Sequence, residues 1–395
     1  MHDFLTSYGG AESVLKELGN MYPNAPVYTM LQEKKVLDEF GEKWLSGREL
    51  VPSFLQKFPK FFKKRKKILL PLMTVAPETY NLRDFDLVVS SSGAFSKGII
   101  VKPKTIHVCY MHSPMRYVWD WYHDYLEENK LKGKMKLFTR FVLNYVRMWD
   151  RSSAQRPDFL IANSEYTAKR IKKYYRRDSK VIYPPVKIND ISPQKENEGY
   201  FMVVARLSPY KRIDAIISAF QKLDLPLIIV GEGVQKKELE EQIKQGKNSK
   251  IKLVGWKKRE ELVSLYQNAR AFVFAAEEDF GIVAVEAMAA GKPVLALNQG
   301  GLKEIIKENI SGLFFDEPIM ELIADAVRRF VNREKEFDFN VVRSEAEKFS
   351  VERFRKEFQE YVEGIENNTL PPTPPVKGGE NGDFFERKNS DNNFS

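Results

Sequence analysis

Short apolar runs alternate with helical stretches along most of this 395-residue chain. Such alternation is typical of βαβ units, in which crossover helices join parallel strands. In the first half, the predicted strands are residues 86–90, 105–110 and 159–162. Each is followed by Ser, Gly, His or Asn, the small polar residues expected where parallel strands end in a binding crevice. The pattern predicts an α/β fold.

A second set of alternating segments follows a polar, proline-containing linker at residues 181–199. Its predicted strands are residues 200–205, 226–230, 250–254, 271–275 and 293–297. A chain of 395 residues is too long for one ordinary core, so we expect two Rossmann-like domains, residues 1–188 and 189–347.

The end of the chain changes character twice. Residues 348–365 are predicted to form a helix that crosses back, because apolar residues recur there at helical spacing. These residues are Val351, Phe354, Phe358, Tyr361 and Val362. Residues 366–395 are rich in Asn, Pro, Gly and charge, so we expect a disordered tail.

Composition excludes several classes of protein. The single cysteine, Cys109, rules out an internal disulfide framework and fits a reducing compartment. With only four histidines beside it, no clustered zinc site is expected. No run approaches the roughly 18–20 apolar residues of a membrane helix, and residues 1–10 do not resemble a signal peptide. We expect a cytoplasmic protein whose net charge of +9 favours an anionic partner.

Residues 276–294, A-E-E-D-F-G-I-V-A-V-E-A-M-A-A-G-K-P-V, are the most informative stretch. An acidic turn follows an apolar strand, and a helix is predicted from about residue 281 to residue 290. The N–H groups of Phe280, Gly281 and Ile282 are expected at its N-terminus, where free amides and the helix dipole favour an anion.

Glu286 stands alone among apolar neighbours on that helix. A buried carboxylate is costly unless hydrogen-bonded. Two sugar hydroxyls would each donate a hydrogen bond to it. Pairing with an internal arginine, or capping nearby amides, would also satisfy it, and spacing alone leaves both readings open.

Two cations follow a predicted strand in V-V-A-R-L-S-P-Y-K-R-I-D, residues 203–214. The strand is expected to end at Arg206 and a helix to begin near Pro209, which places Arg206 and Lys211 about one loop apart. A diphosphate needs such a pair, and each charged hydrogen bond contributes roughly 1.5–3 kcal/mol. The alternative is that both are solvated loop residues.

Five segments in register resemble the retaining GT-B glycosyltransferases of family 4. Glu278 and Glu286 match the E-x7-E motif, and residues 204–214 match the R…K diphosphate motif. Y-G-G-A-E-S-V-L at 8–15 resembles the glycine loop, and A-N-S-E-Y-T-A at 162–168 resembles the Asn-Ser turn. C-Y-M-H-S-P-M-R-Y-V-W-D at 109–120 resembles an O-antigen mannosyltransferase-like branch. The resemblance runs from Asp3 to about Val362.

The resemblance implies roles for the residues already singled out. Residues 1–188 become the acceptor-side domain and 189–347 the nucleotide-sugar domain. Glu286 would hold the ribose, and Glu278 the hydroxyls of the transferred sugar. Arg206 and Lys211 would neutralise the diphosphate, aided by the amides of residues 280–282.

The first domain would contribute glycines and a histidine to the same site. Gly9 and Gly10 would border the donor, and Gly10 would allow close approach because it lacks a Cβ. His112 would reach across the cleft toward the sugar. The alternative is that His112 is an ordinary histidine at the end of a strand.

The implied activity is metal-independent hexosyl transfer, with GDP-mannose as the first expected donor and no cofactor. The acceptor would be a glycan or lipid-linked, in polysaccharide or O-antigen synthesis. Same-face attack is the family's usual proposal, and no carboxylate is named as a nucleophile. A catalytically silent nucleotide-binding protein of the same fold is the alternative. A dehydrogenase is disfavoured, because G-E-G-V-Q-K at 231–236 does not complete G-x-G-x-x-G.

Residues 54–70, F-L-Q-K-F-P-K-F-F-K-K-R-K-K-I-L-L, interleave aromatic and basic side chains. With a lipid-linked acceptor they would form a membrane-surface patch at the inner face of the cell membrane. The patch is assigned to Lys60, Lys63, Lys64, Arg65, Lys66 and Lys67. A solvated face or a nucleic-acid surface are the alternatives, but no nucleic-acid partner is expected because no such fold motif accompanies the stretch.

Family members usually begin with a strand directly before the His-Asp position, which here is His2-Asp3. The innermost strand of the first sheet is therefore expected to be missing. Codons upstream of Met1 are expected to encode about five mostly β-branched residues. A chain carrying them should be more soluble, melt higher and turn over faster.

Overall fold

The computed structural model describes residues 1–59, 69–128 and 132–367. Its first part is a parallel sheet with the order β3-β2-β1-β4-β5-β6-β7. The strands are β1 (His2–Leu5), β2 (Val27–Gln32), β3 (Leu50–Pro52), β4 (Leu87–Ser92), β5 (Ile106–Met111), β6 (Phe159–Ala162) and β7 (Lys180–Val181). The chain order reverses between β1 and β4, the kind of position where open α/β sheets bind ligands.

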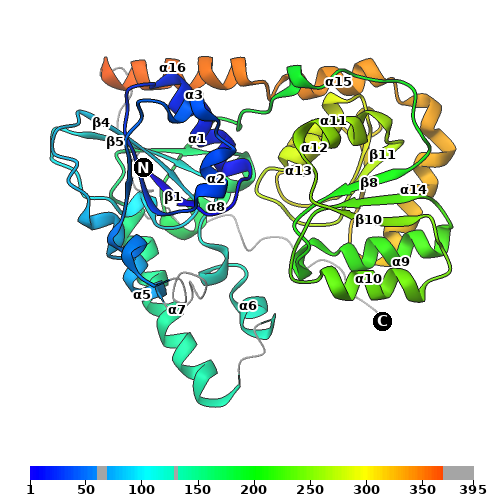
Figure 1. Cartoon of the computed structure of the whole chain (residues 1–395), viewed down its shortest axis with the longest axis horizontal. Helices are drawn as coiled ribbons and strands as arrows, with labels where there is room; N and C mark the ends of the chain where they lie inside the picture. Colours follow the sequence, from blue (N-terminus) through cyan, green and yellow to red (C-terminus); the bar gives the residue numbers. More distant parts are fainter. Residues whose placement is uncertain (60–68, 129–131, 368–395) are drawn as a thin grey trace, which may run out of the picture.

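The second part is a parallel sheet with the order β10-β9-β8-β11-β12-β13. Its strands are β8 (Phe201–Val204), β9 (Leu227–Val230), β10 (Ile251–Gly255), β11 (Ala271–Phe274), β12 (Val294–Leu297) and β13 (Gly312–Phe315). Here the order reverses between β8 and β11. The expected two-sheet α/β architecture is confirmed (Figure 1).

Helices connect the strands in both parts. The first part has α1 (Gly10–Met21), α2 (Lys34–Asp38), α3 (Glu42–Leu45), α5 (Leu70–Met73), α6 (Tyr122–Glu128), α7 (Gly133–Ser153) and α8 (Glu165–Tyr175). The second has α9 (Ile213–Leu223), α10 (Lys236–Gln245), α11 (Arg259–Asn268), α12 (Ile282–Ala289), α13 (Leu302–Ile305), α14 (Met320–Arg333) and α15 (Phe339–Glu347). Two apolar clusters sandwich the second sheet, one with α9 and α14 and the other with α12 and α15.

All eight predicted strands are present, with ends displaced by no more than two residues. The strands that were not predicted are β1, β2, β3, β7 and β13. Three of these, β3, β7 and β13, lie at sheet edges. Edge strands are often short and partly exposed, so they lack the continuous apolar run that marks a central parallel strand.

The chain ends on a helix that returns to the first part. α16 (Val351–Glu366) buries Phe354, Phe358, Val362 and Ile365 against α1, β5 and β6. Figure 1 shows it in orange and red above the first sheet. The predicted helix and its apolar stripe are confirmed. Residues 368–395 of the predicted tail lie outside the described residues, and the domain boundaries stay predictions.

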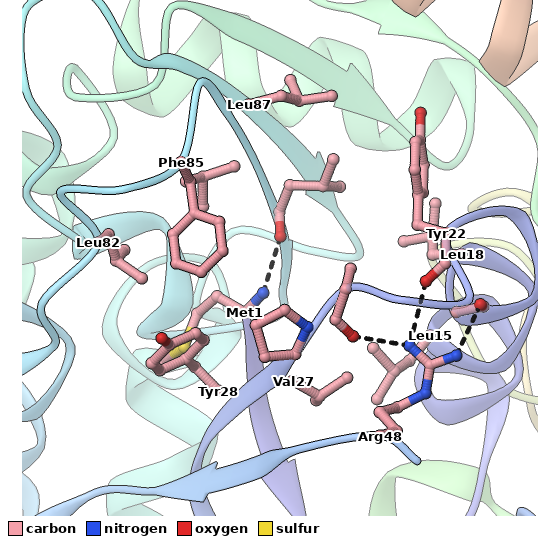
Figure 2. A pocket seen from close by; sticks show the side chains of 15 residues that line it. Met1, Leu15, Leu18, Tyr22, Val27, Tyr28, Arg48, Leu82, Phe85 and Leu87 are labelled. Atoms are coloured by element: carbon pink, nitrogen blue, oxygen red, sulfur yellow. Dashed lines mark hydrogen bonds between the residues drawn. The ribbon is translucent and has the colours of Figure 1, made fainter. Parts of the chain in front are cut away.

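The innermost strand, expected to be missing, is present as β1. His2 pairs with Thr29 on one side and with Ser91 on the other. Because β1 is short, its neighbours β2 and β4 extend past its beginning. An apolar cavity of about 340 Å³ lies between them, lined by Met1, α1 and both strands (Figure 2). The expectation about residues upstream of Met1 stays a prediction.

Candidate active site

The loops that follow the strands at both reversal points face each other across the two parts of the molecule. Gly10, at the start of α1, lies against Ile282, at the start of α12. A Cβ added to Gly10 would lie 2.7 Å from Ile282 Cδ1. Two predicted site segments, one from each sheet, are therefore in contact in this closed arrangement.

Lys211 lies in a short 3-10 turn, Pro209–Lys211, between β8 and α9. Its side chain is buried and its ammonium group contacts the Glu278 carboxylate. Lys211 Nζ also lies 4.8 Å from the ring centre of Tyr210 and 5.0 Å from that of Phe274. Arg206, which follows β8, is exposed at the same loop.

Burial and the contact with Glu278 have opposite effects on the pKa of Lys211. Burial lowers the pKa of Lys211 to about 7, and the guanidinium groups of Arg116 and Arg206 act in the same direction. The contact with Glu278 favours the charged form. A dianionic ligand between the two side chains would contact Arg206, which is always charged, and Lys211, whose charged form the ligand itself would stabilise.

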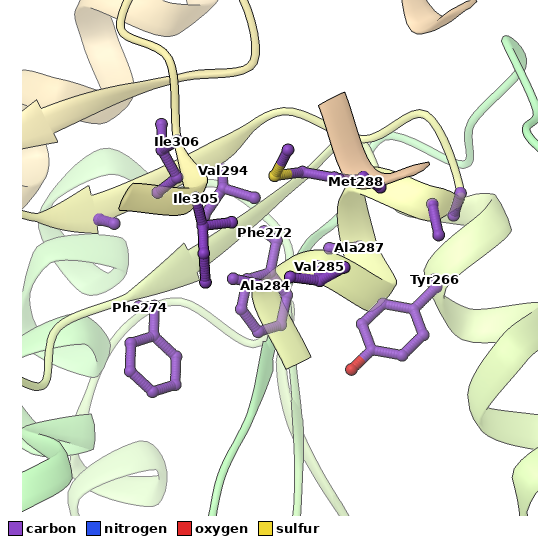
Figure 3. Close-up of a cluster of buried hydrophobic side chains, with 14 of the residues drawn as sticks. Tyr266, Phe272, Phe274, Ala284, Val285, Ala287, Met288, Val294, Ile305 and Ile306 are labelled. Carbon is purple, nitrogen blue, oxygen red and sulfur yellow. The ribbon is translucent and has the colours of Figure 1, made fainter. Parts of the chain in front are cut away.

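α12 carries the rest of the predicted donor site. Ala284, Val285, Ala287 and Met288 pack into the core beside β11 and β12, which fixes the helix (Figure 3). Gly281 caps the helix with a φ of 116°, a left-handed conformation that favours glycine. α12 therefore begins directly after the acidic turn, and its first residue, Ile282, lies next to Gly10 of the first part.

Glu286 has protein partners. Arg259 Nη1 donates to Oε1 at 2.5 Å, and the Tyr266 hydroxyl donates to Oε2 at 3.1 Å. Pairing with an internal arginine, one of the two interpretations that the sequence left open, is thus what the structure shows. Each carboxylate oxygen still has a second lone pair, and 13% of the side chain is exposed. Glu286 can therefore still accept hydrogen bonds from a ligand hydroxyl.

His112 lies directly after β5 in a chain of polar side chains. Ser91 Oγ lies 2.7 Å from His112 Nε2 and 3.0 Å from His2 Nδ1. The hydroxyl donates to one ring and accepts from the other. Burial lowers the pKa of His112 to about 4, and His2 acts in the same direction. His112 is therefore neutral at physiological pH.

Asp3, beside His2 in β1, fixes the loop after β4. Its carboxylate accepts hydrogen bonds of 2.6–2.9 Å from four successive backbone N–H groups, those of residues 93–96. The loop borders His112, since a Cβ on Gly93 would lie 3.9 Å from His112 Cβ. The His-Asp pair of β1 thus organises this side of the cleft.

Sequence reasoning missed the residue that joins the two parts most directly, Asp279. Its carboxylate forms ion pairs with Arg116 (3.3 Å) and Arg170, both from the first part. Ser164 Oγ donates to the Asp279 carbonyl oxygen at 2.5 Å. The Met-Arg motif contained Arg116 and the Asn-Ser motif contained Ser164, with Arg170 two residues beyond it, but only the fold shows that they cross to the acidic turn.

A second set of cross-contacts surrounds the N-terminus of α8. Glu304 accepts hydrogen bonds of 2.7 Å from the backbone N–H groups of Glu165 and Tyr166. The Tyr166 hydroxyl donates to Glu277 Oε1 at 2.6 Å. The turn carrying Glu278 is therefore held by the first part on both sides.

A cavity of about 450 Å³ opens beside Glu278. It is lined by both parts, including Arg116 and Trp121 from the first and Tyr210 and Glu278 from the second. The rings of Trp121 and Tyr210 meet edge to face with centres 5.5 Å apart. The cavity has room for a sugar ring next to the Lys211–Glu278 pair.

Two other predictions concern membranes. The patch at Lys60, Lys63, Lys64, Arg65, Lys66 and Lys67 lies outside the described residues. Within the described ranges, no helix is long and apolar enough to cross a bilayer.

Two family models match the chain in succession. Residues 8–190 match Glycosyltransferase Family 4, and residues 187–345 match Glycosyl transferases group 1. The chain belongs to the family 4, group 1 glycosyltransferases. The first match covers the glycine loop and the His112 segment of this family 4 chain, and the second covers both cations and the acidic turn.

Similar proteins agree with that membership. An uncharacterised glycosyltransferase of Methanocaldococcus jannaschii is 28% identical over 45% of this chain and 51% of its own length. The D-inositol 3-phosphate glycosyltransferase of Mycolicibacterium smegmatis is 26% identical over 45% of this chain and 46% of its own. The match thus spans about half the length of these relatives.

Solved structures share the fold. Sucrose-phosphate synthase from Thermosynechococcus elongatus has a TM-score of 0.70 at 15% identity, covering 93% of this chain and 99% of that one. Anabaena HepE in complex with UDP has a TM-score of 0.67 at 17% identity, covering 92% of this chain and 98% of that one. The GT-B architecture expected of a family 4 chain is confirmed.

Proposed function

We propose that this chain transfers a hexosyl unit from a nucleoside-diphosphate sugar to an acceptor hydroxyl, with retention and without a metal. One observation carries the proposal: the buried Lys211 contacts Glu278 at the mouth of a cavity, beside Arg206 and the N-terminus of α12. Cations for a diphosphate and a carboxylate for sugar hydroxyls are thus adjacent.

Donor binding would exchange partners within this cluster. The diphosphate replaces Glu278 as the partner of Lys211, and Arg206 contacts it from the exposed side. Glu278 then accepts hydrogen bonds from hydroxyls of the transferred sugar. The amides of Phe280, Gly281 and Ile282 face the same anion, and Glu286 accepts from the ribose while Arg259 holds its other side.

The reaction needs charge stabilisation and positioning. The bond between the anomeric carbon and the diphosphate oxygen breaks, and the acceptor oxygen forms the new bond on the same face. The acceptor proton passes to the departing diphosphate. Lys211 and Arg206 stabilise the negative charge that grows on that group, and neutral His112 orients a hydroxyl of the sugar.

The mannosyl donor rests on the resemblance of residues 109–120 alone. Related proteins widen the choice, because HepE structures contain UDP and UDP-glucose, and a Salmonella typhimurium relative is a lipopolysaccharide 1,2-N-acetylglucosaminetransferase. We therefore propose a glycan or lipid-linked acceptor in polysaccharide synthesis, at the cytoplasmic face of the membrane. The alternative, a catalytically silent nucleotide-binding protein of the same fold, was made plausible by the expected loss of the first strand, and β1 is present.

A thermal-shift panel of GDP-, UDP- and ADP-sugars tests the proposal. A donor present at about 100 times its dissociation constant should stabilise the protein by roughly 2.7 kcal/mol. One nucleotide should give a clear rise in Tm that the Lys211→Ala variant loses. A panel in which no donor shifts the wild-type Tm would reject the proposal.

Donor affinity should fall as pH rises from 6 to 9. Protonated Lys211 binds the anion, and its pKa of about 7 in the free protein means that the charged form is lost across this range. The bound diphosphate raises the pKa of Lys211, so binding at pH 8 should take up protons. Calorimetry in buffers of different ionisation enthalpy measures that uptake.

The control for this pH effect is Lys211→Gln, which has no titrating group. Nucleoside-diphosphate sugars should be used, because they lack the terminal phosphate ionisation of a free diphosphate. The variant should bind more weakly and with no proton uptake. The same uptake in both proteins would assign the pH dependence to another group.

Activity should survive excess EDTA. No D-x-D pair stands in the sequence beside the proposed diphosphate site, and the described residues contain no group of three His, Cys, Asp or Glu side chains suited to a metal. Lys211 and Arg206 supply the positive charge instead. Complete loss of turnover on chelation, restored by manganese or magnesium, would contradict the metal-independent assignment.

A further inference from the structure

α7 presents an unusual exposed face. It is 21 residues long, and its buried residues, Leu143, Val146, Asp150 and Ser153, all lie from its midpoint onward. The first half extends away from the sheet, toward the bottom of Figure 1. Six of the fourteen exposed large apolar residues in the described ranges lie on this one helix, so they are concentrated rather than scattered.

These apolar side chains form a stripe. Phe138, Phe141, Tyr145 and Met148 follow one another at intervals of three or four residues, so they lie on one face of the helix. Phe138 and Phe141 are 65% and 68% exposed. A soluble helix normally turns such residues inward, so this stripe needs an apolar surface outside the domain.

α5 lies beside the stripe and extends it. The hydroxyl groups of Thr74 and Tyr145 lie 3.4 Å apart, which joins the end of α5 to the middle of α7. Two apolar residues close to Thr74 in the sequence, Leu72 and Val75, are exposed as well. The apolar surface therefore spans two segments that are distant in sequence.

The exposed charged side chains of α7 are all positively charged. The exposed basic side chains are Lys134, which lies one helical turn before Phe138, and Arg140 and Arg151. Arg147 instead packs on the rings of Trp119 and Tyr122. The only acid on α7, Asp150, is buried against Lys97, Trp119 and Tyr175. A surface that covers this face must be both apolar and anionic.

We propose that α7 docks the protein on an anionic lipid bilayer, with the stripe of Phe138, Phe141, Tyr145 and Met148 inserted between the headgroups. An amphipathic helix with aromatic residues on one face, and with only basic residues among its exposed charges, suits that boundary. A second copy of this chain fits less well, because pairing two such helices brings cations together with no acid to neutralise them. The inference does not depend on the donor chemistry.

Co-sedimentation with vesicles tests this surface. The full chain is mixed with vesicles of phosphatidylcholine alone or with added phosphatidylglycerol. The wild type should bind the anionic vesicles at least tenfold more strongly than the neutral ones. The double variant Phe138→Glu, Phe141→Glu should lose at least tenfold of that binding with an unchanged Tm, since both side chains are exposed.

Val234→Glu with Val341→Glu is the matched control, because both valines are exposed apolar residues in the second part. It should bind vesicles as the wild type does. Arg140→Ala with Arg151→Ala should weaken binding to anionic vesicles and leave binding to neutral vesicles unchanged. Equal loss in the valine control, or no binding by the wild type, overturns the proposal. A wild-type dimer that the phenylalanine variant converts to a monomer, without any vesicle binding, also overturns it.

Discussion

Lys211→Ala should lower kcat/KM at least tenfold while the protein stays folded. Lys211 is the buried cation that contacts Glu278, and the proposed diphosphate takes its ammonium group as a partner. A hydrogen bond to a charged group contributes roughly 1.5–3 kcal/mol, which corresponds to about 10- to 150-fold in rate. Steady-state release of nucleoside diphosphate measures the change.

A second buried lysine provides the control. Lys292 donates to the carbonyl oxygens of Gln194 at 2.7 Å and Glu196 at 3.0 Å, at the amino-terminal end of β12 and away from the cleft. Lys292→Ala should lower the Tm but keep turnover per folded molecule. If the two variants lost activity equally, Lys211 would be a structural lysine.

Glu286→Ala should also lower kcat/KM at least tenfold. Wild-type activity of this variant would show that Glu286 is not part of the donor site.

Asp279→Ala should open the cleft. The Asp279 carboxylate pairs with Arg116 and Arg170, whose side chains are 24% and 6% exposed. Removing one member of a buried ion pair in an unchanged structure costs about 3–5 kcal/mol. Arg170 keeps Asp120 as a partner at 2.8 Å, so this cost falls mainly on Arg116, and the two parts can avoid it by separating, which returns the Arg116 guanidinium group to water. Small-angle scattering should show a larger radius of gyration, and the KM for the donor should rise.

Asp325→Ala is the matched variant for this test. Asp325 pairs with Arg329 at 2.8 Å on exposed α14, far from the joint between the two parts. It should leave both the scattering curve and KM unchanged. Identical scattering from Asp279→Ala and the wild type would show that the remaining contacts of Glu277 and Glu304 suffice to hold the closed arrangement.

The sequence predicted most of the interior strands because parallel strands buried on both faces have continuous apolar sequences. β8 and β11 are of this kind, with Phe201, Met202 and Phe272 almost fully buried. β1 was judged missing from the family pattern, which places a strand before the His-Asp position, but His2–Leu5 themselves form the strand. His2 and Asp3 are buried there by specific partners, Ser91 and the amides of residues 93–96. Those partners are about 90 residues away, so no local pattern reveals them.

The site shows the same division. Local motifs singled out Lys211 and Glu278, which the fold brings into contact, and Glu286, which lies one helical turn along α12 from Ile282. The partners that hold them were not predictable from local pattern, because they come from other elements: Arg259 for Glu286, and Arg116 and Arg170 for Asp279. The sequence marked the acidic turn as a candidate ligand site, but gave no sign that it is also the joint between the two parts.

The most direct test of the proposed transfer follows both products of one reaction. The donor selected by thermal shift is incubated with glycan acceptors, and with water as the simplest acceptor, while nucleoside diphosphate release and the anomeric configuration of the new product are recorded by NMR. We expect release that Lys211→Ala reduces at least tenfold and a product with the same anomeric configuration as the donor. A product of inverted configuration, or a donor that binds but is never cleaved, would contradict retaining transfer at this site.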